Sequence, residues 1–218
     1  MRYGIIGTGT VGRTLADKLL TLGHEVMLGS RTRENSAASA WAEKAGPNGH
    51  GGTFADAAAF GGTVVNATAG TVSLKALHAA GAAPLAGKVL IDVSNPLVFS
   101  AEGEVSLDPV CTDSVGERIQ REFPQARVVK ALNTMSAPVM VDPGRVPGEH
   151  NAFVAGDDPD AKAEVTALLA QFGWPVGSVL DLGDIKGARG MEMLMPFWLR
   201  LMGHFGSTDF NYSLRSAG

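Results

Sequence analysis

The sequence predicts an α/β fold: a doubly wound parallel sheet with a small C-terminal α/β lobe. Two patterns predict it. Short apolar runs alternate along the 218 residues with Ala- and Leu-rich stretches of helical spacing, as in chains built from repeated strand–helix units. The first run, residues 2–6, leads into a glycine loop at 7–12, and one helical face follows, formed by Val11, Leu15, Leu19 and Leu22.

The remaining elements follow in order. Strands are expected at 24–29, 51–54, 63–67, 88–92 and 127–131, separated by helices at 34–46, 55–60, 72–81 and 114–123. A stretch rich in Pro, Gly and charge, 138–149, predicts a joint between a larger domain over 1–140 and a lobe over 150–218. Within the lobe we expect a strand at 151–155, a helix at 159–172, a strand at 175–180 and a long final helix.

The glycine loop has the G-x-G-x-x-G spacing of dinucleotide-binding turns, and its place between a strand and a helix is the context that this motif requires. Gly7 permits the tight turn, Gly9 lets a pyrophosphate approach the backbone, and Gly12 lets the helix pack closely on the strand. Free N–H groups at the helix N-terminus attract phosphate. A glycine-rich turn that binds nothing is the alternative. The loop predicts a Rossmann domain that binds its dinucleotide through Gly7, Thr8, Gly9, Thr10, Val11 and Gly12.

The end of the second strand indicates which dinucleotide is bound. A site selective for NAD usually places Asp or Glu about 20 residues after the loop, where it accepts from the ribose 2′-hydroxyl. Residues 29–33 contain no acid and instead provide Ser30, Arg31 and Arg33. A hydroxyl and guanidinium groups suit a 2′-phosphate, which a carboxylate would repel. We therefore expect NADP(H), with ordinary solvated loop charges as the alternative.

The ends of the later strands nominate further cofactor-binding residues, because ligands of doubly wound sheets lie outside the carboxyl ends of the strands. Strand 63–67 ends beside Thr68 and Ala69, strand 88–92 leads to Asn95 and Pro96, and strand 127–131 leads to Asn133. Either asparagine can bond ribose hydroxyls or the nicotinamide carboxamide, and Pro96 can fix the loop beneath the ring. Asn-Pro as a plain turn is the alternative.

Composition and charge exclude several classes. The net charge of −4 and the lack of a basic run argue against nucleic-acid binding and against an electrostatic membrane anchor. One cysteine, Cys111, fits a reducing cytoplasm, and no signal peptide is expected ahead of the first strand. The histidines are scattered, and the chain has no metal-ligand spacing, so we expect no metal.

The C-terminal segment 187–202 is apolar almost all round and rich in Met. Such a helix is buried in a core, an interface or the wall of a pocket, and it is too short and too charged to span a membrane. Met side chains adapt to flat apolar ligands, so this helix is the candidate wall of a second-substrate cleft or a dimer contact. Arg189 and Glu192 are three residues apart, a spacing that permits them to pair on one helix face.

The chain resembles the F420-dependent NADP reductase family. The glycine loop, the Gly29–Arg31 turn and the segment Val128–Thr134 carry the resemblance, together with Gly156–Asp158 and 181–192. It implies a homodimer, NADP(H) across the strand ends, and hydride exchange with a 5-deazaflavin coenzyme between the lobes. The match supports Thr8, Gly9, Thr10, Val11, Ser30 and Arg31 as cofactor-binding residues. The chain departs from the family at Asn133, where reductases carry histidine, and at Ser136; Asn133 is expected to orient the nicotinamide.

Three functions follow as hypotheses. The first is an NADP(H)-dependent oxidoreductase that transfers hydride between NADPH and coenzyme F420. The second is an NADPH-dependent reductase of another small acceptor: a flavin, quinone, imine or metal chelate. The third is a redox sensor that binds NADP(H) without turnover. The sequence offers no cluster of catalytic acids, which favours direct hydride transfer or binding over carbonyl reduction, where a proton donor is usual.

Overall fold

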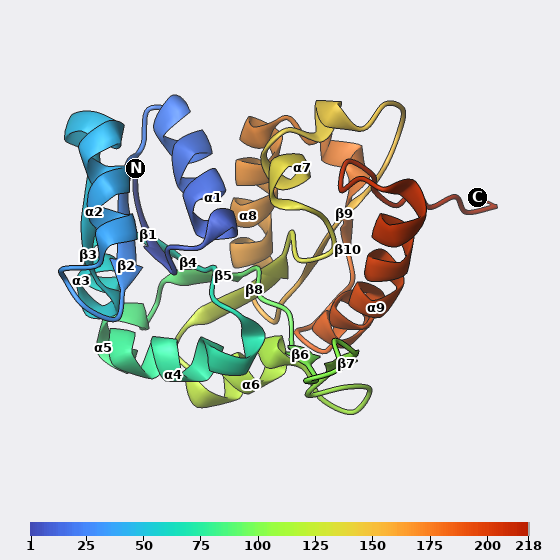
Figure 1. The fold of residues 1–218 in the computed structure, drawn as a ribbon, viewed down its shortest axis with the longest axis horizontal. Helices are drawn as coiled ribbons and strands as arrows, with labels where there is room; N and C mark the ends of the chain where they lie inside the picture. The colour runs from blue at the N-terminus through green and yellow to red at the C-terminus, as the bar shows by residue number, and fades with distance from the viewer. Residues whose placement is uncertain (218) are drawn as a thin grey trace.

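The computed structural model describes residues 1–217 and contains an eight-stranded sheet in the order β10-β9-β8-β5-β4-β1-β2-β3 (Figure 1). Six strands run parallel, and β9 pairs with β8 in the antiparallel sense, so that β9 and β10 run the other way. The strands are β1 (Arg2–Ile6), β2 (Glu25–Ser30), β3 (Gly49–Thr53), β4 (Thr63–Asn66), β5 (Val89–Asp92), β8 (Arg127–Ala131), β9 (Ala152–Ala155) and β10 (Val179–Asp181). The six parallel strands confirm the doubly wound sheet.

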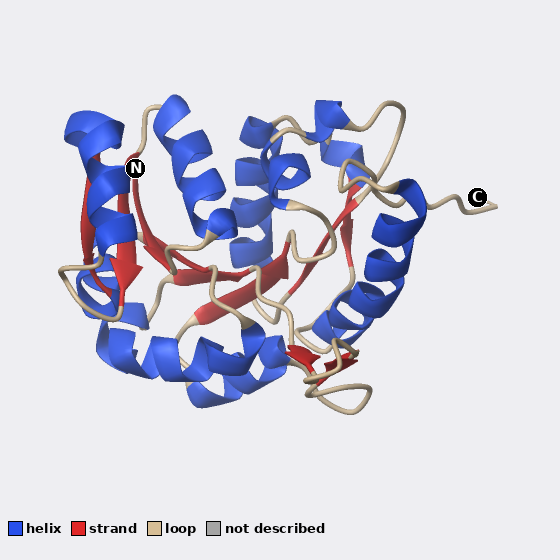
Figure 2. Cartoon of the chain, in the orientation of Figure 1, coloured by secondary structure: helices blue, strands red, loops and turns tan. Residues whose placement is uncertain are grey.

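Helices cover both faces of this sheet, which is therefore buried between two layers (Figure 2). One face packs against α1 (Thr10–Thr21), α2 (Ser36–Ala45), α7 (Ala137–Val141) and α8 (Pro159–Phe172). The opposite face packs against α3 (Phe54–Phe60), α4 (Gly70–Ala80), α5 (Ala82–Leu85) and α6 (Val115–Glu122). Near-continuous Val, Ile and Leu in the central strands fit this burial, because both faces of each strand lie in the core.

The last part of the chain adds to the same sheet. Strands β9 and β10 extend it past β8, and α9 (Gly187–Phe205) packs beside them. A two-stranded hairpin, β6 (Leu97–Phe99) with β7 (Val105–Leu107), leaves the sheet after β5 and contacts α9. The division into 1–140 and 150–218 stays a prediction, since one sheet contains strands from both ranges.

The segment 138–149 contains most of α7 and the 3-10 turn Pro143–Arg145, and its role as a joint stays a prediction. One local expectation differs from the structure. The strand expected at 175–180 is a 3-10 turn, Val176–Ser178, followed by the short β10. Pro175 lacks an N–H and Gly177 gains little from an extended ladder, so the apolar pattern there does not produce a full strand. No helix in residues 1–217 is both long and apolar enough to cross a membrane.

Candidate functional site

The register of the sheet brings the expected site residues to one edge. Ile6 aligns with Gly29 on β2 and with Asn66 on β4, while Asp92 aligns with Lys130 across β5 and β8. Backbone bonds continue this alignment just past the strand ends: Gly7 donates to the carbonyl of Gly29, and Ala67 to that of Ile6. The glycine loop, Ser30, Thr68, Asn95 and Asn133 therefore all lie at the carboxyl edge of the sheet.

The three loop glycines have three different surroundings. Gly7 has a φ of +122°, which favours glycine, and a Cβ there would lie 2.7 Å from the carbonyl oxygen of Ala67. A Cβ on Gly12 would lie 2.4 Å from the carbonyl oxygen of Gly7, so this position requires close helix–strand packing. A Cβ on Gly9 would meet no atom within 4 Å. Of the three, Gly9 is therefore the one whose Cβ position is open.

The N-terminus of α1 lacks a side-chain partner. Helices α2, α3, α6 and α8 are each capped by a side chain, from Asn35, Thr53, Ser114 and Asp158. Gly9 is the N-cap of α1 and supplies none, and the first turn contains no acid. The N–H groups at this end are thus free to bind an anion, which the helix dipole favours. A pyrophosphate is the kind of anion that such a helix end can bind.

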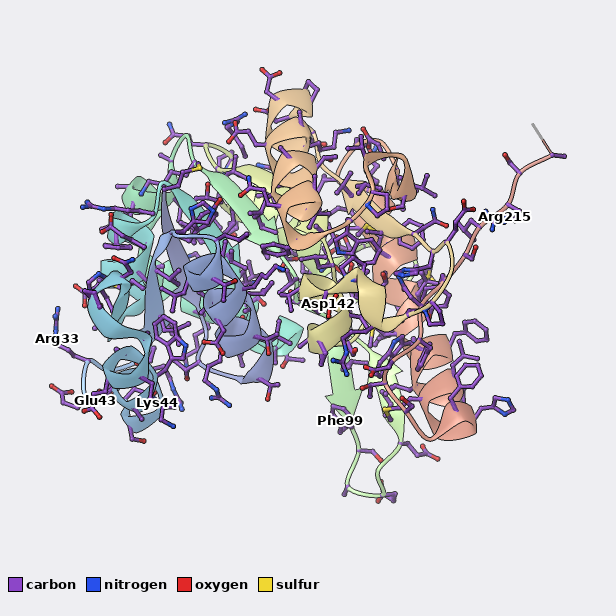
Figure 3. All side chains as sticks on the ribbon, turned by 90° about the horizontal axis from the view of Figure 1, so that it is seen from above. Arg33, Glu43, Lys44, Phe99, Asp142 and Arg215 are labelled. Atoms are coloured by element: carbon purple, nitrogen blue, oxygen red, sulfur yellow. The ribbon has the colours of Figure 1, made fainter. Side chains whose placement is uncertain are left out.

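The end of β2 separates the two arginines. Ser30 is buried, and its hydroxyl donates to the carbonyl of Thr32. Arg33 lies at the outer margin of the molecule and pairs with Asp56, with 2.7 Å between Nη2 and Oδ2 (Figure 3). Within residues 1–217 Arg31 makes no ion pair. Arg31 is therefore the guanidinium available to a 2′-phosphate, whereas Arg33 must first leave Asp56.

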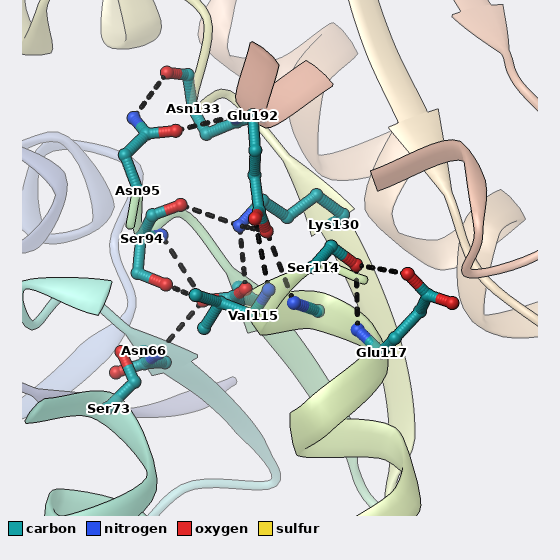
Figure 4. Close-up of polar contacts among 12 residues, drawn as sticks. Asn66, Ser73, Ser94, Asn95, Ser114, Val115, Glu117, Lys130, Asn133 and Glu192 are labelled. Atoms are coloured by element: carbon teal, nitrogen blue, oxygen red, sulfur yellow. Dashed lines mark hydrogen bonds and ion pairs between the residues drawn. The ribbon is translucent and has the colours of Figure 1, made fainter. Parts of the chain in front are cut away.

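The two asparagines face each other. Asn95 donates from Nδ2 to the backbone carbonyl of Asn133 over 2.8 Å, and Asn133 donates from Nδ2 to Oδ1 of Asn95 over 2.9 Å (Figure 4). Asn133 is 1% exposed and Asn95 is half-buried, so Asn95 is the more accessible member of the pair. The Oδ1 of Asn133 is buried without a partner in the described chain. Asn95 is therefore the more exposed member of a pair whose two side chains bond each other.

The same edge also holds Thr68, Ala69 and Pro96, which differ in exposure and in hydrogen bonding. The Thr68 hydroxyl donates to Oδ1 of Asn66 over 2.7 Å and is turned into the protein. Ala69 is exposed at the N-terminus of α4, where Gly70 donates to the backbone carbonyl of Asn95. Pro96 is buried just before β6. These residues shape the backbone of the site more than they offer free polar groups.

A buried charge cluster beside this edge has no counterpart in the sequence-based prediction. Lys130 is fully buried, and its Nζ lies 2.8 Å from Oδ2 of Asp92 and 2.7 Å from Oε1 of Glu192 (Figure 4). Glu192 also accepts from the backbone N–H groups of Val115 and Gly116 at the start of α6. Burial alone would lower the pKa of Lys130, but the two carboxylates raise it above its usual value. Lysine inside the apolar run 127–131 was the signal for this cluster.

Arg189 and Glu192 take partners outside their own helix. Arg189 forms a two-point ion pair with Glu117 of α6, at 2.7 and 2.6 Å, while Glu192 points to Lys130. A spacing of three residues permits a pair on one helix face, but each side chain instead pairs with a residue of another element, Arg189 with α6 and Glu192 with β8. Both interactions fasten α9 to the main body of the sheet.

The inner face of α9 forms an apolar wall with the hairpin. Met195, Trp198 and Phe210 are buried together, and Leu97 and Leu107 of the hairpin pack against them. Trp198 stacks on Phe210 with ring centroids 5.3 Å apart. The indole N–H of Trp198 is buried without a partner in the described chain. This wall begins one residue after Pro96 and therefore borders the nicotinamide end of the expected cofactor site.

The described residues contain no group of three His, Cys, Asp or Glu side chains placed to hold a metal ion. Cys111 is free and exposed. The polar groups at the sheet edge are hydroxyls, amides and backbone N–H groups, which suit phosphates, ribose and carboxamide.

Comparison with known proteins agrees with this geometry. The model of a family described as coenzyme F420-dependent NADP oxidoreductase matches residues 2–96, which span the glycine loop, Ser30–Arg31 and Asn95. An F420-dependent NADP reductase from Methanothermobacter thermautotrophicus is 33% identical over 213 residues, covering 92% of this chain and 89% of the relative. The rat metalloreductase STEAP3 is 30% identical over 201 residues, and the chain spans 38% of its length.

A solved structure agrees over almost the whole chain. The crystal structure of a candidate F420-dependent NADP reductase from Arthrobacter sp. FB24 is 51% identical and superposes with a TM-score of 0.94. The similarity covers 99% of this chain and 100% of the other, including α9 and the strands beyond β8.

Proposed function

Because the chain belongs to the F420-dependent NADP reductase family and is an NADP(H)-dependent oxidoreductase, we propose that it transfers hydride between NADPH and the deazaflavin coenzyme F420. The observation that carries the cofactor assignment is the end of β2. There a free Arg31 and a buried Ser30 lie beside the glycine loop, where a carboxylate would select NAD. The choice of F420 as the hydride acceptor rests on the name of the family.

The residues at the sheet edge divide the work of binding. The N–H groups at the start of α1 would bind the pyrophosphate, with Gly9 giving it room, and Arg31 would bind the 2′-phosphate. The Asn95 amide would hold the carboxamide or ribose at the nicotinamide end, with Asn133 fixing its orientation. When bound, NADPH supplies the hydride, and the protein contributes mainly by holding donor and acceptor in register.

The apolar wall of α9 is the proposed surface for the acceptor. Met195 and Trp198 on the α9 side are buried in one cluster with the half-buried Leu97 of the hairpin, so a flat ring system would meet the exposed margin of this cluster. Packing there would exclude water from the transfer site.

A reductase acting on another acceptor is the second candidate. Its support is the rat metalloreductase, 30% identical over 201 residues, whose name indicates that a related sequence serves metal reduction. A flavin, quinone, imine or metal chelate would use the same NADP(H) site. The third function, a redox sensor without turnover, would be excluded if the protein turned over any of these acceptors.

We further propose a cytoplasmic homodimer. Large apolar side chains remain on the outer face of α9, where Met193, Phe197 and Phe205 are 41%, 54% and 56% exposed. A second copy that covered this face would bury them, as dimer contacts commonly do. The single free cysteine suits a reducing compartment.

Steady-state kinetics with a panel of acceptors tests the proposed function. NADPH or NADH would be mixed anaerobically with F420, FMN, a quinone, a cyclic imine and a ferric chelate, and nicotinamide oxidation would be recorded at 340 nm. The proposal expects turnover with NADPH and F420 and weak activity with NADH. Faster turnover with a different acceptor would transfer the assignment to that acceptor, and a preference for NADH would contradict the cofactor assignment.

A further inference from the structure

Helix α9 is fastened to the loop 94–97 at two separate points. The first is ionic: Nζ of Lys130 bridges Glu192 of α9, at 2.7 Å, and the backbone carbonyl of Ser94, at 2.6 Å. The second is apolar: Met195 and Trp198 of α9 pack in one cluster with Leu97. The two points flank Asn95 and Pro96, which form the proposed nicotinamide contact. The place of α9 and the place of this loop are therefore mechanically linked.

The ionic fastening is complete. The ammonium of Lys130 has three N–H groups and three acceptors: Asp92, the Ser94 carbonyl and Glu192. Asp92 is satisfied from its other side by the amide of Asn66 at 2.8 Å and by the hydroxyl of Ser94 at 2.7 Å. Fully satisfied buried networks rigidify their surroundings, because each bond lost would leave an unpaired group in a medium of low dielectric.

The network holds the loop at Ser94, directly before Asn95, whose side chain is the proposed contact to the nicotinamide half. Asn95 is one residue beyond Ser94, its backbone carbonyl accepts from Gly70 of α4, and its side chain bonds Asn133. A shift of the Ser94 carbonyl would move Asn95 against all these partners. Among the described residues, Gly9 and Arg31 at the other end of the site share no hydrogen bond or ion pair with this network.

We propose that Lys130 and Glu192 are positioning residues that set the loop 94–96 for the nicotinamide half of NADP(H), and that they transmit to it the position of α9. The inference rests on the proposed function, since it presumes that the nicotinamide lies beside Asn95. It separates the site into two parts: an adenosine end fixed by the glycine loop and β2, and a nicotinamide end fixed by the network.

Two nucleotides distinguish the adenosine end of the site from the nicotinamide end experimentally. NADPH reaches both ends, whereas adenosine 2′,5′-bisphosphate lacks the nicotinamide half and reaches the adenosine end alone. Dissociation constants for both would be measured by isothermal titration calorimetry with wild type, Glu192→Gln and the double variant Lys130→Met/Glu192→Gln. The double variant removes one charge of each sign, so the network keeps its net charge and Asp92 keeps its bonds to Asn66 and Ser94.

Glu117→Gln is the matched control. It weakens another buried contact between α6 and α9, the pair with Arg189, without touching Lys130 or the loop. A melting curve for each variant would show that the compared proteins are folded.

The proposal expects the double variant to weaken NADPH about tenfold, Glu192→Gln to weaken it about threefold, and adenosine 2′,5′-bisphosphate to change by less than about twofold in both. Glu117→Gln should leave both constants as in wild type. Equal losses for the two nucleotides, no loss for either, or an equal effect of Glu117→Gln would overturn the inference while the proposed function stands. Failure of wild type to bind NADPH would refute the proposed function itself. If the double variant does not fold, Glu192→Gln alone tests the inference, by its loss of affinity for NADPH compared with its loss of affinity for adenosine 2′,5′-bisphosphate.

Discussion

Replacing Arg31 by alanine tests the cofactor assignment most sharply, because Arg33 offers a matched control two residues away. Arg31 is exposed and has no ion pair in the described chain, whereas Arg33 is paired with Asp56 at 2.7 Å with side chains 66% and 31% exposed. A hydrogen bond to a charged group contributes about 1.5–3 kcal/mol, so Arg31→Ala should weaken NADPH roughly 10- to 150-fold.

The expected effect of Arg33→Ala is smaller. To bind the 2′-phosphate, Arg33 would have to leave Asp56, and such an exposed pair contributes about 0.2–1 kcal/mol, which offsets part of any gain. We therefore expect Arg33→Ala to weaken NADPH less than Arg31→Ala does.

Fluorescence titration of each variant with NADPH and NADH measures these changes. NADH has no 2′-phosphate, so its affinity should be the same in wild type and both variants. The reasoning would be refuted if Arg31→Ala weakened NADH as much as NADPH, or if Arg33→Ala had the larger effect on NADPH. In the second case Asp56 would not hold Arg33 away from the phosphate.

Three further predictions concern the loop, the pH dependence and the assembly. Gly9→Val should abolish NADPH binding and leave the melting temperature near that of wild type, whereas Gly12→Val should lower the melting temperature because its Cβ would lie 2.4 Å from a backbone oxygen; calorimetric melts with titrations check both. The bond from Arg127 lowers the pKa of Asp158 from 3.8 to about 2, so its stabilisation is complete above pH 3.8 and is lost as the pH falls toward 2. Asp158→Asn should flatten the fall of melting temperature in that window, and an unchanged slope would contradict this assignment. Phe197→Glu should convert the proposed dimer into a monomer in light scattering, and a monomeric wild type would refute the dimer.

Local rules were enough to predict the sheet and the placement of the glycine loop at its edge. The glycine loop, the strand before it and the helix after it lie within the first 22 residues, and each glycine role depends on neighbours in one strand–loop–helix unit. The strand ends were likewise predictable, since parallel strands in a doubly wound sheet place their carboxyl ends together. These expectations needed no knowledge of distant contacts.

Long-range contacts were the part that the sequence did not predict. Lys130 meets Asp92 and Glu192 from distant segments, and Arg189 selects Glu117 over its own helix neighbour. The restraint of Arg33 by Asp56 depends on the approach of α3 to the end of β2. Such choices are made by tertiary packing, and periodicity or spacing within one segment carries no information about them. A charged residue inside an apolar strand is the general sign that a buried partner must exist.

Stopped-flow absorbance of the protein with NADPH and F420, with FMN as the control acceptor, tests the central claim most directly. In a single turnover with enzyme in excess, hydride transfer predicts that the deazaflavin absorption band bleaches at the same rate as NADPH absorbance is lost, while FMN is reduced far more slowly. NADPH bound tightly while the F420 band stays unchanged would contradict transfer to the deazaflavin and direct the search to another acceptor.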